Sequence, residues 1–184
     1  MGPGDRVPQT SSTHPRWFRA PGRTSRRSRA FTTLDVVAAD WLHLTLAGVG
    51  HADQVDPHQL DQIVEQVRTV AKLRVTVAFE RVVVGDEAVV LVAQPCDELD
   101  RLRHDLATAI RDAAQDAAPR ADPRTRFAPH VSLAYANAAQ PAAPVRAALD
   151  TIAPTTCTVT APTLSLIELE RDNRAYQWRT VLRL

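Results

Sequence analysis

The chain has 184 residues, of which 45% are hydrophobic, and carries a formal net charge of +1. This length fits one ordinary domain with a packed core, and no run approaches the roughly 18 apolar residues of a membrane-spanning helix. No apolar secretory signal begins the chain, so we expect a cytoplasmic protein with no membrane partner. The cysteines, Cys96 and Cys157, lack a C-x-x-C pairing, which favours free thiols over a disulfide or a zinc site.

Positive charge is concentrated at the start of the chain. Residues 1–30 hold seven arginines against the single acid Asp5, with scattered Pro, Gly and Ser and no apolar period. This composition predicts a disordered basic tail at 1–30 ahead of one domain at 31–184, although a basic arm that attracts RNA has the same composition. The remaining domain is acidic, which suits a nucleotide or a chain end better than long nucleic acid.

Strand and helix patterns alternate after Trp41. The expected strands are Trp41–Ala47, a hairpin of Arg74–Val84 and Glu87–Gln94, Pro129–Tyr135, Cys157–Glu170 and Tyr176–Leu184. The expected helices are Pro57–Leu73, Asp97 to about Ala117, and Pro144–Ile152. The first follows an Asp56-Pro57 start. The second has an apolar stripe on one face, made of Leu99, Leu102, Leu106, Ala109 and Ile110.

This order predicts the α+β class, with mainly antiparallel sheets and helices on the outer faces. The segments WLHLTLA at Trp41 and APHVSLA at Ala128 match in character position by position, and each precedes a helix and a strand pair. We therefore expect a pseudo-twofold duplication of β-α-β-β units that brings the two motif strands side by side.

The repeated segments carry the chemistry. Because side chains alternate across a strand, His43 and Thr45 share one face, and His130 and Ser132 share the matching face of the second strand. One imidazole can take a proton from water while the other gives one to the leaving ribose oxygen, and the hydroxyls can donate to the phosphate oxygens. The alternative without a catalytic role is that both histidines belong to the core of half-buried strands, where their ring nitrogens are hydrogen-bonded.

Three further residues are candidates for substrate binding. Trp41 lies two residues before His43, on the same face of the expected strand, and can stack on a base. The alternative is that Trp41 is an aromatic residue packed at the start of the strand. Tyr135 reaches a ligand only if its strand has turned, because strict alternation places it on the helix side. Arg179, in the last strand, is a candidate for a phosphate contact.

Metal catalysis is not expected. His51 lies near Asp53 and Asp56, but no paired cluster accompanies His130, so we expect neither a metal nor a cofactor.

At the two H-x-[ST]-x motifs the sequence resembles the two-histidine (2H) phosphoesterase superfamily, which includes the 2′-5′ RNA ligase-like proteins and cyclic phosphodiesterases. The strongest pieces are DWLHLTLAGVG, FAPHVSLAY and YQWRTVLRL, within Ala39–Leu184. The resemblance implies a bilobal fold in which His43, Thr45, His130 and Ser132 line a central cleft. It also implies a strand and a helix before the first motif, for which only Phe31–Ala39, or a degraded strand at His14–Phe18, is available, so we expect a shortened first lobe.

The implied activity is metal-independent phosphodiester chemistry by a monomer. The implied substrates are RNA ends with a 2′,3′-cyclic phosphate or a 2′-5′ linkage, or small cyclic nucleotides, with ligation as the reverse reaction. The shortened lobe keeps a second hypothesis open, that the chain is a nucleotide- or RNA-end-binding module of the same fold that has lost catalysis. A third reading is a structural domain without a ligand.

Overall fold

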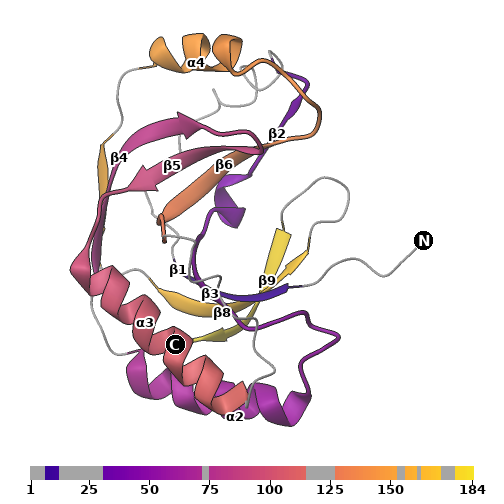
Figure 1. Ribbon diagram of the computed structural model, residues 1–184, viewed down its shortest axis with the longest axis vertical. Coiled ribbons are helices and arrows are strands. Elements are labelled where there is room, and N and C mark those ends of the chain that lie inside the picture. Colours follow the sequence, from indigo (N-terminus) through magenta and orange to yellow (C-terminus); the bar gives the residue numbers. More distant parts are fainter. Residues whose placement is uncertain are drawn as a thin grey trace.

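The computed structural model joins the strands into one curled, antiparallel sheet with helices packed against it (Figure 1). It describes the backbone of residues 7–12 and, with side chains, residues 31–71, 75–114, 127–152, 156–160, 163–170 and 177–184. The helices are α2 (Pro57–Val70), α3 (Asp97–Ala114) and α4 (Ala142–Asp150), and a 3-10 turn, η3, spans Ala39–Trp41. The strands are β1 (Val7–Ser12), β2 (Leu34–Val36), β3 (Leu44–Gly48), β4 (Thr76–Val84), β5 (Ala88–Ala93), β6 (His130–Ala136), β7 (Cys157–Thr160), β8 (Leu164–Glu170) and β9 (Gln177–Arg183). The α+β prediction is confirmed.

The two motif strands lie at the centre of the sheet. The strand order is β7-β4-β5-β6-β3-β1-β8-β9, with β2 added beside β6. β3 and β6 are antiparallel neighbours, with Leu44 opposite Val131. The prediction that the repeated segments lie side by side is therefore confirmed, with about half of the sheet on each side of them.

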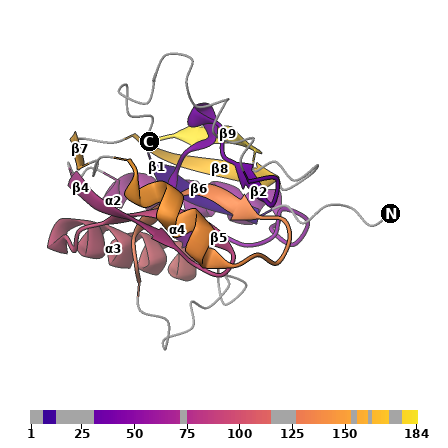
Figure 2. The same cartoon turned by 90° about the horizontal axis from the view of Figure 1, so that it is seen from above.

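The three α-helices of the described residues cover one face of the curled sheet. Leu44 and Leu46 of β3 are buried in the core that α2 and α3 close, and Val131 of β6 belongs to the same core. On the other half of the sheet, Val145 of α4 packs against Val89 and Ala134. Figure 2 shows α4 over one half and α2 and α3 beneath the other. The opposite face, which carries His43, Thr45 and Ser132, is called the histidine face below.

Local sequence signals set the start of α2 and the turn between β4 and β5. Asp56 caps α2 by accepting a hydrogen bond from the backbone N–H of His58 at 2.8 Å, and Pro57 occupies the first helical position. The predicted hairpin forms between β4 and β5, where the Gly85 N–H donates to the Ala88 carbonyl oxygen at 2.9 Å. The apolar stripe predicted for the second helix is buried in α3, with Leu99, Leu102, Leu106, Ala109 and Ile110.

The predicted single strand Cys157–Glu170 is wrong. It consists of two strands in opposite halves of the sheet, because β7 pairs with β4 whereas β8 pairs with β1 and β9. The sequence has Pro162 between them, and proline lacks the N–H that a continuous ladder requires. The two repeats consequently exchange strands, since β4 and β5 follow the first motif in sequence but pair beside the second.

A prediction for the start of the chain is also wrong. Val7–Ser12, placed in a disordered tail, forms β1 between β3 and β8. The alternation of apolar and polar residues does not reveal this strand. A strand with neighbours on both sides is held by backbone hydrogen bonds, which a polar segment can also make. β1 gives the first half of the sheet the strand it was expected to lack, while His14–Phe18 lies outside the described residues.

None of the helices described here has the length and apolar character needed to cross a membrane.

Candidate active site

The two motifs meet around the Leu44–Val131 pair. In an antiparallel register centred on that pair, His43 lies opposite Ser132, and Thr45 lies opposite His130. Side chains directly opposite one another have Cβ atoms about 4.5–5.5 Å apart, and diagonal neighbours about 7–8 Å. Each histidine therefore lies beside the hydroxyl of the other motif, and the two histidines occupy one diagonal of the four-residue cluster.

Both imidazole rings are held by the same kind of hydrogen bond. Nδ1 of His43 lies 2.9 Å from the carbonyl oxygen of Trp41, and Nδ1 of His130 lies 2.7 Å from that of Ala128. Because a carbonyl oxygen only accepts, Nδ1 carries the hydrogen in both rings. Nε2 is then the atom left to exchange protons with a substrate, in the same tautomer at both motifs.

The surroundings of the two histidines differ. His43 is half-buried, and burial lowers its pKa below the ordinary value of 6.5, with a further lowering from the charge of His130 and an opposing rise from the hydrogen bond to Trp41. His130 is exposed, so water can solvate its charged form. Burial thus favours a neutral imidazole at His43.

Tyr135 rejoins the histidine face through a β-bulge. The register between β5 and β6 shifts so that Val90 pairs with Ser132 but Val89 pairs with Ala134, which leaves Leu133 as the extra residue. Tyr135 therefore lies opposite Ala88, on the same face as Ser132. The sequence-based expectation required the strand to turn, and the bulge provides that change of face.

Trp41 lies at the end of η3 instead of inside a strand. Its ring makes an edge contact with the ring of Trp178 from β9, with centroids 5.7 Å apart and an interplanar angle of 84°. Its carbonyl oxygen accepts hydrogen bonds from His43 and from the Trp178 indole N–H. The prediction that a strand begins at Trp41 is wrong, because these residues make turn bonds such as Trp41 N–H to Ala38 O.

Arg179 makes an ion pair with Glu168 of β8. The Glu168 side chain is 9% exposed and the Arg179 side chain 71%. Arg179 lies opposite Glu168, whereas its neighbour Trp178 lies opposite Leu169, so the two alternate to different faces of β9. The structure consequently separates Arg179 from the residues around His43.

No group of three or more metal-binding side chains occurs within the described ranges, which include His51, Asp53 and Asp56. Cys96 and Cys157 are free thiols, as predicted.

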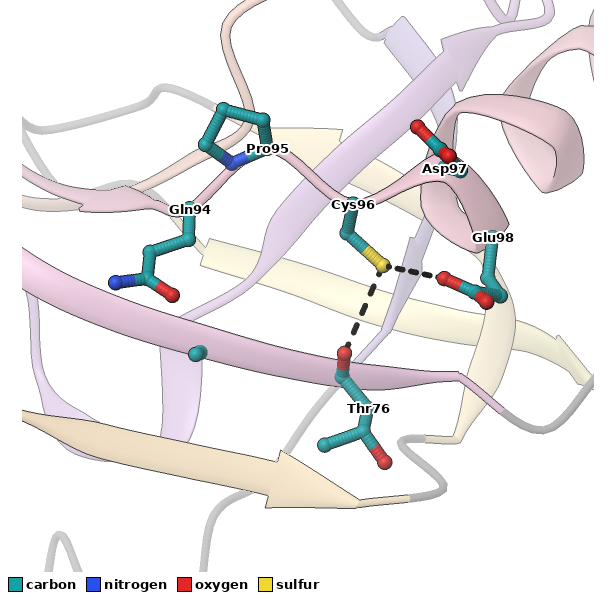
Figure 3. A pocket seen from close by; sticks show the side chains of 7 residues that line it. Thr76, Gln94, Pro95, Cys96, Asp97 and Glu98 are labelled. Atoms are coloured by element: carbon teal, nitrogen blue, oxygen red, sulfur yellow. Dashed lines mark hydrogen bonds between the residues drawn. The ribbon is translucent and has the colours of Figure 1, made fainter.

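A pocket of about 340 Å³ lies away from the histidines, between β4 and the start of α3 (Figure 3). The Cys96 thiol donates to a carboxylate oxygen of Glu98 at 3.3 Å and faces the Thr76 carbonyl oxygen at 3.7 Å. The Glu98 backbone N–H and the thiol hold the pKa of that carboxyl below its ordinary value. Two lining carboxylates, Asp97 and Glu98, make this pocket unsuitable for a phosphate.

Comparison with known protein families gives a match along most of the chain. The model of the 2′-5′ RNA ligase superfamily matches residues 18–173, a span that includes both histidine motifs. The chain belongs to the 2′-5′ RNA ligase superfamily. The resemblance to the 2H phosphoesterases inferred from the motifs is confirmed.

Several solved structures share the fold of this chain at low sequence identity. Escherichia coli LigT without ligand is 18% identical, with a TM-score of 0.69 over 99% of this chain and 98% of LigT. LigT bound to 3′-AMP is 18% identical, with a TM-score of 0.72 over 98% of this chain and 97% of LigT. A protein of Thermus thermophilus is 18% identical, with a TM-score of 0.71 over 97% of this chain and 96% of that protein. No curated protein matches the chain.

Proposed function

We propose that this protein is a metal-independent phosphodiesterase that opens 2′,3′-cyclic phosphates at RNA ends or in small nucleotides by His43/His130 acid–base catalysis. The observation that carries the proposal is the pair of matching Nδ1 hydrogen bonds, at 2.9 Å and 2.7 Å, which leave both Nε2 atoms for proton transfer. Each imidazole lies beside a hydroxyl of the opposite strand, so two proton-transfer groups and two donors surround one position. Such a cluster suits a phosphoryl group with charge on its non-bridging oxygens.

His43 acts as the general base in this proposal. Its lowered pKa keeps Nε2 unprotonated near neutral pH, ready to accept a proton from the attacking water. Exposed His130 is the general acid and donates its Nε2 hydrogen to the leaving ribose oxygen. The water oxygen forms a bond to phosphorus, the P–O3′ bond breaks, and the products are a 2′-phosphate and a free 3′-hydroxyl. If a ribose 5′-hydroxyl replaces the water as nucleophile, the same step joins its oxygen to phosphorus, breaks the P–O3′ bond and gives a 2′-5′ linkage with a free 3′-hydroxyl. The reverse of that step, with the roles of the two histidines exchanged, cleaves a 2′-5′ linkage to a 2′,3′-cyclic phosphate.

Thr45 and Ser132 donate to the non-bridging oxygens, and Tyr135 offers a ring to the nucleoside from the same face. LigT has been solved with 3′-AMP, ATP and NADP+, which supports a nucleotide as the ligand class. Trp41 contributes to the site mainly through its carbonyl oxygen, which holds His43, because its ring packs against the ring of Trp178.

The decisive experiment is hydrolysis of 2′,3′-cyclic nucleotides in the presence of EDTA, by wild-type protein and by the His43→Ala and His130→Ala variants. We expect wild-type turnover to survive chelation and each variant to lose about 10²–10⁴-fold, the usual share of general acid–base catalysis. His104→Ala is the matched control, because His104 is exposed on α3. Wild-type rates in either motif variant would refute the assignment.

A folded wild-type protein that binds cyclic nucleotides but releases no product would favour the binding-module alternative. If phosphate compounds also caused no rise in melting temperature, the third hypothesis, a structural domain without a ligand, would be supported. A ligand that binds only the native state must raise the melting temperature.

A further inference from the structure

Trp178 reaches the hydrogen bond of His43 from a distant part of the chain. Its indole Nε1–H donates to the Trp41 carbonyl oxygen at 3.1 Å, across 137 sequence positions. The same oxygen accepts the Nδ1–H of His43 at 2.9 Å. One carbonyl therefore links β9, at the edge of the sheet, to the histidine that we propose as general base.

The position of this carbonyl depends on contacts outside the strand ladder. Trp41 ends the η3 turn, and β3 begins only at Leu44. The edge contact between the two indole rings, at 5.7 Å, holds the Trp41 side chain against β9. Figure 2 shows the turn before β3 close to β9. Trp178 consequently fixes both the ring and the carbonyl of Trp41.

The second motif is built differently. Nδ1 of His130 donates to the Ala128 carbonyl oxygen at 2.7 Å, and no second side-chain donor to that oxygen occurs among the residues that the structure describes. The two motifs thus share the histidine–carbonyl bond but differ in the support of the carbonyl. This asymmetry parallels the burial of His43 and the exposure of His130.

We propose that Trp178 is a positioning residue for His43: its indole N–H holds the Trp41 carbonyl where the Nδ1–H of His43 meets it, and so keeps Nε2 on the histidine face. The kinetic consequence rests on the proposed phosphodiesterase function. The structural part, a ring orientation set from β9, does not depend on it.

A second donor on the carbonyl also has an electrostatic effect. A carbonyl oxygen shared between two N–H groups stabilises the imidazolium of His43 less than an unshared one would. Within the described chain, the titratable group whose charge acts on His43 is His130 of β6, which also lowers the His43 pKa. Removal of the indole N–H should therefore raise the pKa of His43.

The test is Trp178→Phe, which keeps an aromatic ring and deletes the N–H. We expect the NMR titration of the His43 ring to move to higher pH, and kcat for a 2′,3′-cyclic nucleotide to fall about tenfold, less than the ~10²-fold cost of a 1 Å misplacement. KM should stay within about twofold, since Trp178 acts through the position of the base. Leu182→Val is the matched control, because Leu182 also lies in β9 but packs against the core under the helices.

An unchanged His43 titration together with unchanged kcat in Trp178→Phe would overturn the proposal, as would an equal change in Leu182→Val. If the wild-type protein has no turnover, the phosphodiesterase assignment fails, while the NMR titration still decides the role of Trp178. If Trp178→Phe does not fold, hydrogen exchange of the Trp178 indole N–H in the wild-type protein tests its hydrogen bond to the Trp41 carbonyl oxygen. Slow exchange is expected, and exchange at the rate of free indole would refute the hydrogen bond.

Discussion

His43 and His130 donate the same Nδ1 hydrogen bond, each to the carbonyl oxygen of the residue two positions earlier in the chain. This local contact explains why two strands so far apart in sequence present their imidazoles alike. It fixes the tautomer and leaves the choice of acid and base to the surroundings, where burial separates the two rings.

The lowered pKa of His43 makes stability depend on pH. Burial and the charge of His130 hold this pKa below 6.5 in the folded protein, so the unfolded chain binds a proton more readily. The contribution of His43 to stability is fully present above the unfolded pKa of about 6.5, and is lost as pH falls through the folded pKa. We expect the melting temperature of the wild-type protein to fall more steeply than that of His43→Gln between about pH 7 and pH 5. Parallel curves for the two proteins would contradict this linkage.

The hydroxyls should contribute to the chemical step rather than to substrate binding. Thr45→Val and Ser132→Ala each remove a donor beside an imidazole, and we expect kcat to fall about 10²-fold with little change in KM, as for the loss of one oxyanion donor. Ser132→Thr keeps the hydroxyl and should retain most of the rate. Steady-state kinetics of the three variants on one cyclic nucleotide would distinguish this role from structural damage, which would lower activity in Ser132→Thr as well.

The sequence predicted the parts of this protein that depend on local pattern. The motif residues, the cap at Asp56 and the stripe of α3 follow from alternation, capping chemistry and helical period, and the structure has the corresponding elements. The face of Tyr135 did not follow, because it depends on a register shift between β5 and β6 that no local pattern marks. The role of Trp178 was hidden for the same reason, since its partner lies 137 positions away.

Tyr135 is expected to bind the nucleoside. Because the bulge at Leu133 returns Tyr135 to the histidine face, Tyr135→Ala should raise KM for a 2′,3′-cyclic nucleotide by about 5–150-fold, the cost of losing about 1–3 kcal/mol of base stacking. Tyr135→Phe keeps the ring and should stay within about threefold of the wild-type KM. A Tyr135→Ala variant with wild-type kinetics would show that the ring only packs against the protein.

Arg179 should stabilise the fold without binding the phosphate. Its removal deletes the ion pair with the carboxylate of Glu168, whose side chain is 9% exposed. We expect Arg179→Ala to lower the free energy of unfolding by about 1–2 kcal/mol, below the ~3–5 kcal/mol of a fully buried pair because Arg179 is itself exposed. KM should be unchanged. A raised KM with unchanged denaturant midpoint would instead identify Arg179 as a phosphate contact.

β1 should be required for folding, although its sequence resembles a polar tail. The strand pairs with β3 along one edge and with β8 along the other, so its removal would leave the backbone of both neighbours without partners inside the sheet. Unpaired buried backbone groups each cost about 1–3 kcal/mol, and several lost together exceed the ~5–15 kcal/mol stability of a typical domain. We therefore expect a variant that begins at residue 31 to show no cooperative thermal transition by circular dichroism. A variant that keeps residues 1–13 but replaces the arginines Arg23, Arg26, Arg27 and Arg29 with serine is the control, because it changes the charge of the segment and leaves the β1 sequence intact. A truncated protein that melts like the wild type would show that the sheet closes without β1.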